Sequence, residues 1–284
     1  MKLSHILFIS VLITAVLVTG LLTSSKLTHK IRQSVYGNNA LTGKYHSING
    51  FQMYCETYGS GQPLLMIHGN GGNITAFSKQ IPFFSKYYKV IVADSRAQGK
   101  STNPLPDSLT YEMMADDYAA LLTTLHIDSA NVIGWSDGGI IGLLMAMRHP
   151  EKIKKLAITG ANLWPDSTAV DTSVLHQVTP VYQQMKQRYA VNGPKKVDDE
   201  INWLLLKLLI EQPHIALADL NKITAPTLVM SGDRDLIHPE HTLHIFKHIP
   251  NAQLWILPNC GHATLIDYAD EFNKKVDVFF KMHN

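Results

Sequence analysis

The sequence predicts an α/β fold in which a mostly parallel β-sheet is flanked by helices. From about residue 45 to the end of the chain, short apolar runs alternate with segments of helical periodicity. Continuous apolar runs are typical of strands whose two faces are both covered by crossover helices. A 45% hydrophobic content in 284 residues is enough for a sizeable core.

The first elements follow from local pattern. Two stretches of strand character flank Gly50, and Cys55 lies in the second. Apolar runs at residues 63–68 and 89–94 predict two further strands, and each is followed by a polar loop that contains glycine. A helix is predicted over residues 111–125, because apolar residues recur there at three- and four-residue spacing.

The rest of the chain continues the alternation, with one interruption. The predicted elements are a strand at 131–133, a helix at 138–147, strands at 155–159, 226–231 and 253–257, and an amphipathic helix at 267–282. Residues 161–220 interrupt it with a helical insert rich in aromatic residues and leucine. An insert after a strand lies near the carboxyl edge of a parallel sheet, where ligands bind. We therefore expect a lid, the alternative being an excursion without a role in substrate choice.

Residues 1–30 differ in kind from the rest. Lys2 precedes an apolar run from residue 6 to residue 22, and further cations follow it. The run is long for a signal peptide and near the lower limit for spanning a bilayer. We expect a signal peptide or an N-terminal membrane anchor at 1–30. The protein is then secreted or anchored, with the domain at 40–284 outside the cytoplasm.

The composition and the spacing of particular residues argue against several classes of protein. A net charge of +2 without any basic cluster argues against a nucleic-acid partner. Cys55 and Cys260 form neither a disulfide framework nor a metal-ligand pattern, although an exported domain would allow them to pair. His241, His244 and His248 share one helix face, and without nearby carboxylates or cysteines they indicate a solvated face rather than a metal site.

The most informative motif is the Gly-x-Ser-x-Gly at residues 134–138, between a predicted strand and a predicted helix. This is the pattern of a nucleophile elbow, a strained strand-to-helix turn that exposes the serine hydroxyl and needs glycines for close backbone approach. Ser136 is therefore the candidate nucleophile.

A serine nucleophile needs a base, and the base needs a carboxylate to orient it. His262 lies in a polar turn just after the final predicted strand, and Asp233 and Asp235 follow the strand at 226–231. The order Ser, Asp, His in the chain is the order of this catalytic arrangement. The residue pattern leaves the choice between Asp233 and Asp235 open, and Asp233 has the alternative role of capping a turn.

Two backbone N–H groups are candidates for an oxyanion hole. Asp137 begins the elbow helix, and Asn70 lies in a glycine-rich loop after the strand at 63–68. The Asp137 carboxylate either favours the helix N-terminus or faces the pocket and pairs with a cationic group of the substrate. Trp135 is a further candidate substrate contact. This chemistry needs neither a metal nor an organic cofactor.

Together these motifs resemble the α/β-hydrolase superfamily, from about residue 45 to the C-terminus. The matching motifs are, in order, 68–71, 94–101, 134–138, 232–235 and 261–262. Within the superfamily, residues 134–139, 160–162 and 270–274 are similar to the biphenyl hydrolase-like and valacyclovir hydrolase group. The resemblance implies an α/β-hydrolase fold with a helical lid at about 161–220.

The resemblance also implies residue roles. It assigns Ser136 as nucleophile, Asp235 as acid and His262 as base, and it implies that Asp137 contacts the amino group of amino-acid esters. Two departures stand out: Ala97 occupies a position where glycine is usual, and the apolar N-terminal segment is foreign to soluble members.

We therefore expect a serine hydrolase, a carboxylesterase, that cleaves esters or related acyl bonds of a small molecule through an acyl-enzyme. Amino-acid esters are the substrate class that the resemblance favours. The same triad also serves carbon–carbon bond hydrolases, aminopeptidases and perhydrolases, and a ligand-binding protein without catalysis is the alternative from another class. The sequence carries no signal for an oligomeric state.

Overall fold

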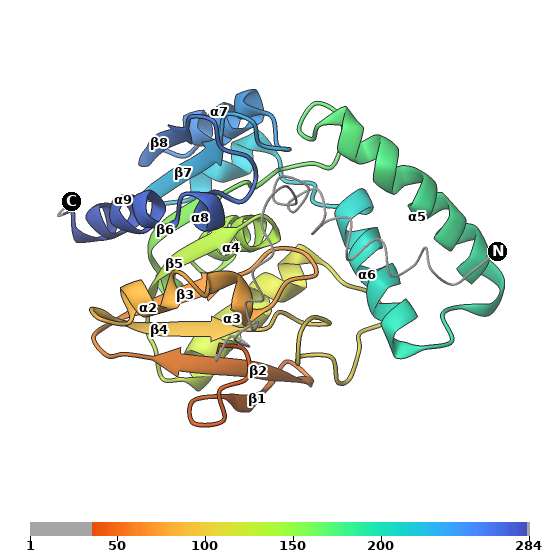
Figure 1. Ribbon diagram of the computed structural model, residues 1–284, viewed down its shortest axis with the longest axis horizontal. Helices are drawn as coiled ribbons and strands as arrows, with labels where there is room; N and C mark the ends of the chain where they lie inside the picture. The colour runs from red at the N-terminus through yellow and green to blue at the C-terminus, as the bar shows by residue number, and fades with distance from the viewer. Residues whose placement is uncertain (1–35, 283–284) are drawn as a thin grey trace, which may run out of the picture. The chain divides into compact units, whose positions relative to one another are not determined.

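An eight-stranded sheet forms the centre of the computed structural model, which describes residues 36–282 (Figure 1). Its strands lie in the order β1-β2-β4-β3-β5-β6-β7-β8. The β1–β2 and β2–β4 pairs are antiparallel, and all later neighbours are parallel. The strands are β1 (Lys44–Ile48), β2 (Phe51–Tyr58), β3 (Gln62–Ile67), β4 (Tyr88–Ala93), β5 (Ala130–Trp135), β6 (Ile153–Thr159), β7 (Thr227–Gly232) and β8 (Ala252–Leu257).

Helices cover both faces of this sheet. In chain order they are η2 (Ile74–Phe77), α2 (Ile81–Phe84), α3 (Tyr111–Thr124), α4 (Asp137–Arg148), η3 (Pro150–Lys152), α5 (Thr172–Asn192), α6 (Val197–Glu211), η4 (Leu217–Lys222), α7 (Pro239–His248), α8 (Thr264–Asp267) and α9 (Ala269–Lys281). One core cluster joins Leu65 to α3, α4 and α7, and the other joins Met66 to α2, α8 and α9. Consecutive strand residues point to opposite faces, so both faces of the sheet are buried. The predicted α/β fold is confirmed.

The predicted strands and helices lie close to the observed ones, including the helix at the C-terminus. The amphipathic helix predicted at 267–282 is α9, and a short helix that was not predicted, α8, precedes it and ends before Tyr268. Tyr268 has φ −119° and ψ 42°, which lies outside the helical region. The chain therefore turns between the two helices.

The insert between β6 and β7 contains α5 and α6, and Figure 1 shows α5 as the outer of the two. One side of α6 packs into the main core through Leu204, Leu205 and Leu208. Its Leu206 instead joins Tyr182 and other α5 residues in a separate small cluster. The α5 helix is thus held mainly through α6, with additional support before its N-terminus from an isolated β-bridge between 170 and 237.

The predicted solvated face of His241, His244 and His248 is wrong for His241. Its side chain is buried, with 1% exposed, and its Nε2 accepts a 2.9 Å hydrogen bond from the Leu163 N–H. The Trp164 ring meets the imidazole edge-on, with 4.6 Å between centroids. Residues at the start of the insert therefore cover this side of α7, while His244 stays exposed.

The predictions tied to export and membrane anchoring need correction. The segment that suggested a signal peptide or anchor, residues 1–30, lies outside the described residues. Within 36–282 no helix is both long and apolar enough to cross a membrane. The expected secreted or membrane-anchored location, with the domain outside the cytoplasm, is accordingly withdrawn. Cys55 and Cys260 are both buried free thiols, so the pairing that export would allow is not formed.

Candidate active site

Ser136 occupies a strained turn between β5 and α4. Its φ of 56° and ψ of −121° lie in a region that residues with a side chain rarely adopt. Two glycines make this turn sterically possible. A Cβ on Gly134 would lie 2.2 Å from the Gly138 carbonyl oxygen, and a Cβ on Gly138 would lie 1.9 Å from that of Ile67. The elbow geometry predicted from the motif is therefore present.

The structure brings Ser136, His262 and Asp235 into one chain of hydrogen bonds. His262 Nε2 lies 2.9 Å from Ser136 Oγ, and His262 Nδ1 lies 2.6 Å from Asp235 Oδ1. An ionised carboxylate only accepts hydrogen bonds, so Nδ1 carries the proton and Nε2 accepts from the serine hydroxyl. Asp235 is buried, and the Ile237 N–H donates a second bond, of 3.0 Å, to the same Oδ1.

Asp233, the alternative acid, has a different environment. Its side chain is exposed, and its Oδ1 accepts a 3.1 Å hydrogen bond from the Cys260 N–H. This is the turn-capping role considered above, and it holds the loop that precedes His262. Of the two aspartates, Asp235 is the one in contact with the histidine.

Two neighbours restrict the position of His262. Gly160, at the end of β6, has φ 65°, and a Cβ there would lie 2.6 Å from the His262 ring. Trp135 donates its indole N–H to the His262 carbonyl oxygen at 2.9 Å. The half-buried Trp135 side chain, a predicted substrate contact, therefore also supports the histidine loop.

The His68 side chain ties the loop after β3, which carries Asn70, to the loop after β4. The His68 Nδ1–H donates to the Gly69 carbonyl at 2.8 Å, and its Nε2 accepts from the Ser95 N–H at 3.0 Å. Complete burial lowers the pKa of His68, against the opposing effect of the Asp94 carboxylate, so the ring is neutral. A Cβ on Gly69 would lie only 3.0 Å from the Ser136 Cβ, which places this loop directly beside the serine.

Asp137 is buried and receives hydrogen bonds from within the protein. The Asn70 Nδ2–H donates to Asp137 Oδ2 at 2.9 Å, and the Tyr111 hydroxyl also bonds this carboxyl group. Burial raises its pKa to about 6, although these two bonds and the nearby His262 lower it. The sequence placed His68 in the motif at 68–71 and Tyr111 at the start of a helix but gave neither a role, because each acts through a contact with a residue distant in the chain.

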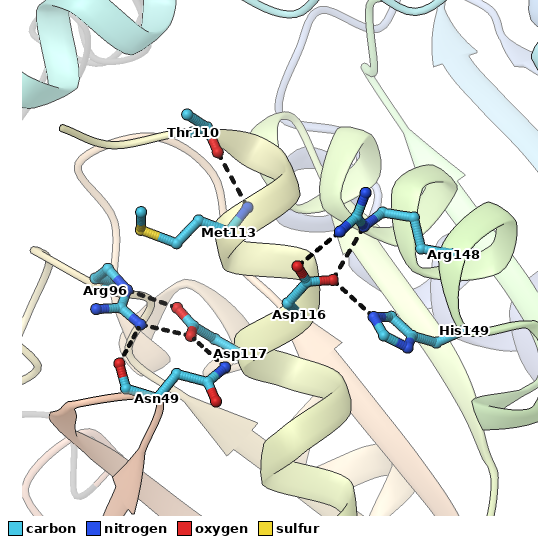
Figure 2. Close-up of polar contacts among 8 residues, drawn as sticks. All are labelled: Asn49, Arg96, Thr110, Met113, Asp116, Asp117, Arg148 and His149. Carbon is cyan, nitrogen blue, oxygen red and sulfur yellow. Dashed lines mark hydrogen bonds and ion pairs between the residues drawn. The ribbon is translucent and has the colours of Figure 1, made fainter.

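The motif at 94–101 contains none of the three residues Ser136, His262 and Asp235, but it supports the loops beside them. Arg96 forms a buried ion pair with Asp117 of α3, with contacts of 2.6 and 2.7 Å, and also bonds the Asn49 carbonyl (Figure 2). Figure 2 shows the preceding α3 residue, Asp116, directed instead toward Arg148 and His149. The motif thus ties the β4 loop, which holds His68, to α3.

Comparison with known proteins supports the same fold and gives the enzymes that this chain is similar to. Residues 62–194 match the model of the alpha/beta hydrolase fold. Serine hydrolase BPHL of Mus musculus is 27% identical over 256 residues, covering 85% of this chain and 87% of that protein. The 2-hydroxymuconate semialdehyde hydrolase of Pseudomonas sp. (strain CF600) is 28% identical over 270 residues, covering 85% of this chain and 95% of that protein. The solved enol-lactonase from Burkholderia xenovorans LB400 matches with a TM-score of 0.69 at 23% identity, over 84% of this chain and all of that one.

The sheet order and the serine at the strand-to-helix elbow define a hydrolase of the α/β type. The chain has the α/β-hydrolase fold and is similar to the biphenyl hydrolase-like serine hydrolases.

Proposed function

We propose that this protein hydrolyses carboxylic esters or closely related acyl bonds of small molecules through an acyl-enzyme on Ser136. The observation that carries the proposal is the continuous hydrogen-bonded arrangement of Ser136, His262 and Asp235, with bonds of 2.9 and 2.6 Å. A serine hydroxyl becomes an effective nucleophile when a neighbouring base accepts its proton.

The proposed reaction has two halves. Ser136 Oγ attacks the carbonyl carbon while its proton passes to His262 Nε2, and the Asp235 carboxylate stabilises the resulting imidazolium. The tetrahedral intermediate collapses, and the alcohol leaves with the proton from Nε2. Water then gives a proton to Nε2 and attacks the acyl-enzyme. The second intermediate releases the carboxylic acid, and Ser136 regains its proton.

The N–H groups of Asn70 and Asp137 are proposed to bind the negatively charged oxygen in both halves. Asp137 is the first residue of α4, where a backbone N–H has no acceptor within the helix. The loop of Asn70 approaches Ser136 from the other side, as the Gly69 contact indicates. Such donors contribute about 10²–10³-fold each to kcat in serine hydrolases.

The proposal is tested with a Ser136→Ala variant and a p-nitrophenyl ester. We expect hydrolysis to fall to background and labelling by a fluorophosphonate probe to disappear. Ser47→Ala, an exposed serine on β1, is the matched control. Turnover by the Ser136 variant at the wild-type rate would show that the mechanism is wrong.

Carbon–carbon bond hydrolysis is a second candidate. It is supported by the similarity to 2-hydroxymuconate semialdehyde hydrolase, at 28% identity. A panel of esters, thioesters, amides and vinylogous diketone acids, assayed with the wild type and the Ser136→Ala variant, separates the two. The larger kcat/KM identifies the bond that the site cleaves.

We further propose that the protein prefers amino-acid esters among carboxylic esters. Asp137 follows Ser136 directly, and its buried carboxylate lies near His262. Alanine esters should then be better substrates than des-amino esters of equal size, and Asp137→Ala should abolish the difference. Equal preference in both proteins would contradict it.

The insert at 161–220 is proposed to act as the lid over the acyl or alcohol group. Its helix α6 reaches the oxyanion loop, since the Leu205 carbonyl oxygen lies 3.4 Å from Asn70 Nδ2. If α6 lines the site, Leu205→Ala should shift the preferred ester chain length, and an unchanged chain-length profile would contradict this role.

A further inference from the structure

The two residues proposed to supply the oxyanion N–H groups also contact each other through their side chains. Asn70 lies in the loop after β3 and Asp137 begins α4, 67 residues further along the chain. The Asn70 Nδ2–H donates to Asp137 Oδ2 at 2.9 Å. A hydrogen bond to an ionised acceptor is roughly twice as strong as one between neutral groups. The contact therefore connects both sides of the proposed hole.

The Asp137 carboxylate is a fixed point for this contact. Its residue is only 3% exposed, and the hydroxyl of the buried Tyr111, at the start of α3, bonds it as well. A buried carboxylate loses much free energy if its donors move away, because water cannot replace them. The Asp137 carboxylate therefore keeps its position and fixes the side chains that donate hydrogen bonds to it.

The loop of Asn70 is a tight turn closed by one backbone hydrogen bond, in which the Gly72 N–H donates to the Gly69 carbonyl at 3.0 Å. Gly69, Gly71 and Gly72 surround Asn70, and Gly71 has φ 65°. Glycine restricts the backbone least of all residues. His68 fixes the start of the loop through Gly69 and Ser95, and the side chain of Asn70 ties the middle of the turn to α4.

A third contact of the Asn70 side chain reaches the insert. Its Nδ2 also lies 3.4 Å from the Leu205 carbonyl oxygen of α6. The two hydrogens of one amide group can serve Asp137 and Leu205 together. Asn70 therefore lies between the elbow helix and the insert.

We propose that the Asn70 side chain and the Asp137 carboxylate form a positioning pair that sets the separation of the two oxyanion N–H groups. The inference rests on the proposed function and adds a role for both side chains that does not involve an amino group on the substrate. A misplaced donor lowers transition-state binding more than substrate binding, so the pair acts mainly on kcat.

An exchange of the two side chains tests the pair. In N70D two carboxylates face each other, which we expect to lower kcat by about 10²-fold, the effect of losing one oxyanion donor. In N70D/D137N the amide and the carboxylate have traded places and the hydrogen bond can form again. We expect that double variant to regain at least about tenfold of the lost kcat, with KM changed by less than about threefold throughout.

The assay uses p-nitrophenyl butyrate at pH 8, since this ester has no amino group to contact Asp137. N251D, an exposed asparagine between α7 and β8, controls for the added charge. Circular dichroism melting gives the folded fraction. Fluorophosphonate labelling of a parallel sample, taken to completion, counts the reactive Ser136 sites, and each rate is divided by that count. A role in folding alone would lower the labelled fraction and leave kcat per labelled serine unchanged, which would overturn the pair.

The remaining outcomes are equally decisive. A folded, labelled N70D/D137N no more active than N70D contradicts the positioning pair and leaves the serine mechanism standing. A wild-type chain that neither labels nor hydrolyses any ester contradicts the proposed function, and the pair falls with it. Recovery of kcat in the exchanged variant, without a matching change in KM, supports the pair.

Discussion

The Leu163 N–H donates a hydrogen bond of 2.9 Å to His241 Nε2, and this bond fastens the base of the insert to α7. The Leu163 carbonyl in turn accepts from the Ile215 N–H, also at 2.9 Å, so the start and the end of the insert meet at this residue. Because Nε2 accepts this hydrogen bond, it carries no proton, and the imidazole is neutral. Burial accordingly lowers the pKa of His241 to about 4.

His241→Gln should therefore remove part of the acid sensitivity of the fold. A histidine whose pKa falls from 6.5 to about 4 on folding contributes stability above pH 6.5 that is lost as the pH falls toward 4. The difference in pKa corresponds to about 3 kcal/mol. Urea unfolding at pH 7 and pH 4 should show a smaller loss of unfolding free energy in the variant, by about that amount. H244Q, an exposed histidine on the same helix, is the control, and equal losses in H241Q and wild type would contradict the assignment.

Asp137→Asn should remove a loss of stability that the wild type suffers as the pH rises, which is the reverse of the pH dependence expected for His241. The pKa of Asp137 rises from 3.8 to about 6 on folding, so its contribution is present below pH 3.8 and is lost as the pH rises through 6. An asparagine cannot ionise. Relative to wild type, the variant should gain up to about 3 kcal/mol between pH 4 and pH 8. Thermal melting at both pH values measures this, with the exposed D128N as control. A pH-independent difference would be evidence against a buried, titrating carboxyl group.

Asp235→Asn should lower kcat by about 10³–10⁴-fold, because an asparagine can present its N–H to His262 and favour the wrong tautomer. Asp233→Asn is the matched control two residues away, and it should change kcat by less than about twofold, since Asp233 is exposed and caps a turn. Kinetics with a p-nitrophenyl ester compare the two variants. A larger loss in the Asp233 variant would reverse the assignment of the acid.

Arg96→Leu should destabilise the fold by about 3–5 kcal/mol, because Asp117 would remain buried without its charged partner and would keep only the hydrogen bond from Asn49. Burial already raises the pKa of Asp117 despite the neighbouring guanidinium. The double change R96L/D117L should cost less than R96L alone, since no buried charge remains. Arg148→Leu breaks the exposed pair with Asp116 and should cost about 1 kcal/mol or less. Urea unfolding of the three variants gives the comparison, and similar costs for R96L and R148L would contradict it.

Signals that are local in the chain predicted most of the fold. Apolar runs located the strands, and helical periodicity located α3 and α4, because these patterns report burial within a few residues. Ser136 was predictable for the same reason, since the glycines that allow its strained turn lie two residues on either side of it. Asp235 and His262 were then indicated as the partners of Ser136 by their order in the chain together with the family resemblance.

Contacts between distant residues could not be predicted in this way. The helical spacing of His241 and His244 correctly placed them on α7, but the burial of His241 depends on Leu163 and Trp164 from the insert. The hydrogen bond between Asn70 and Asp137 joins residues 67 positions apart, and no local pattern encodes it. The neutral state of His68 likewise depends on burial against Ser95 from the next strand's loop.

The sequence by itself determined the α/β class, the elbow around Ser136 and the candidates for its partners, because each follows from short-range patterns of burial and backbone freedom. Only the tertiary structure decided that Asp235 rather than Asp233 contacts His262, that Asn70 bonds Asp137, and that His241 is buried. The physical reason is common to all three. Side-chain partners and their burial are set by packing between elements far apart in the chain, and that packing exists only once the sheet has formed.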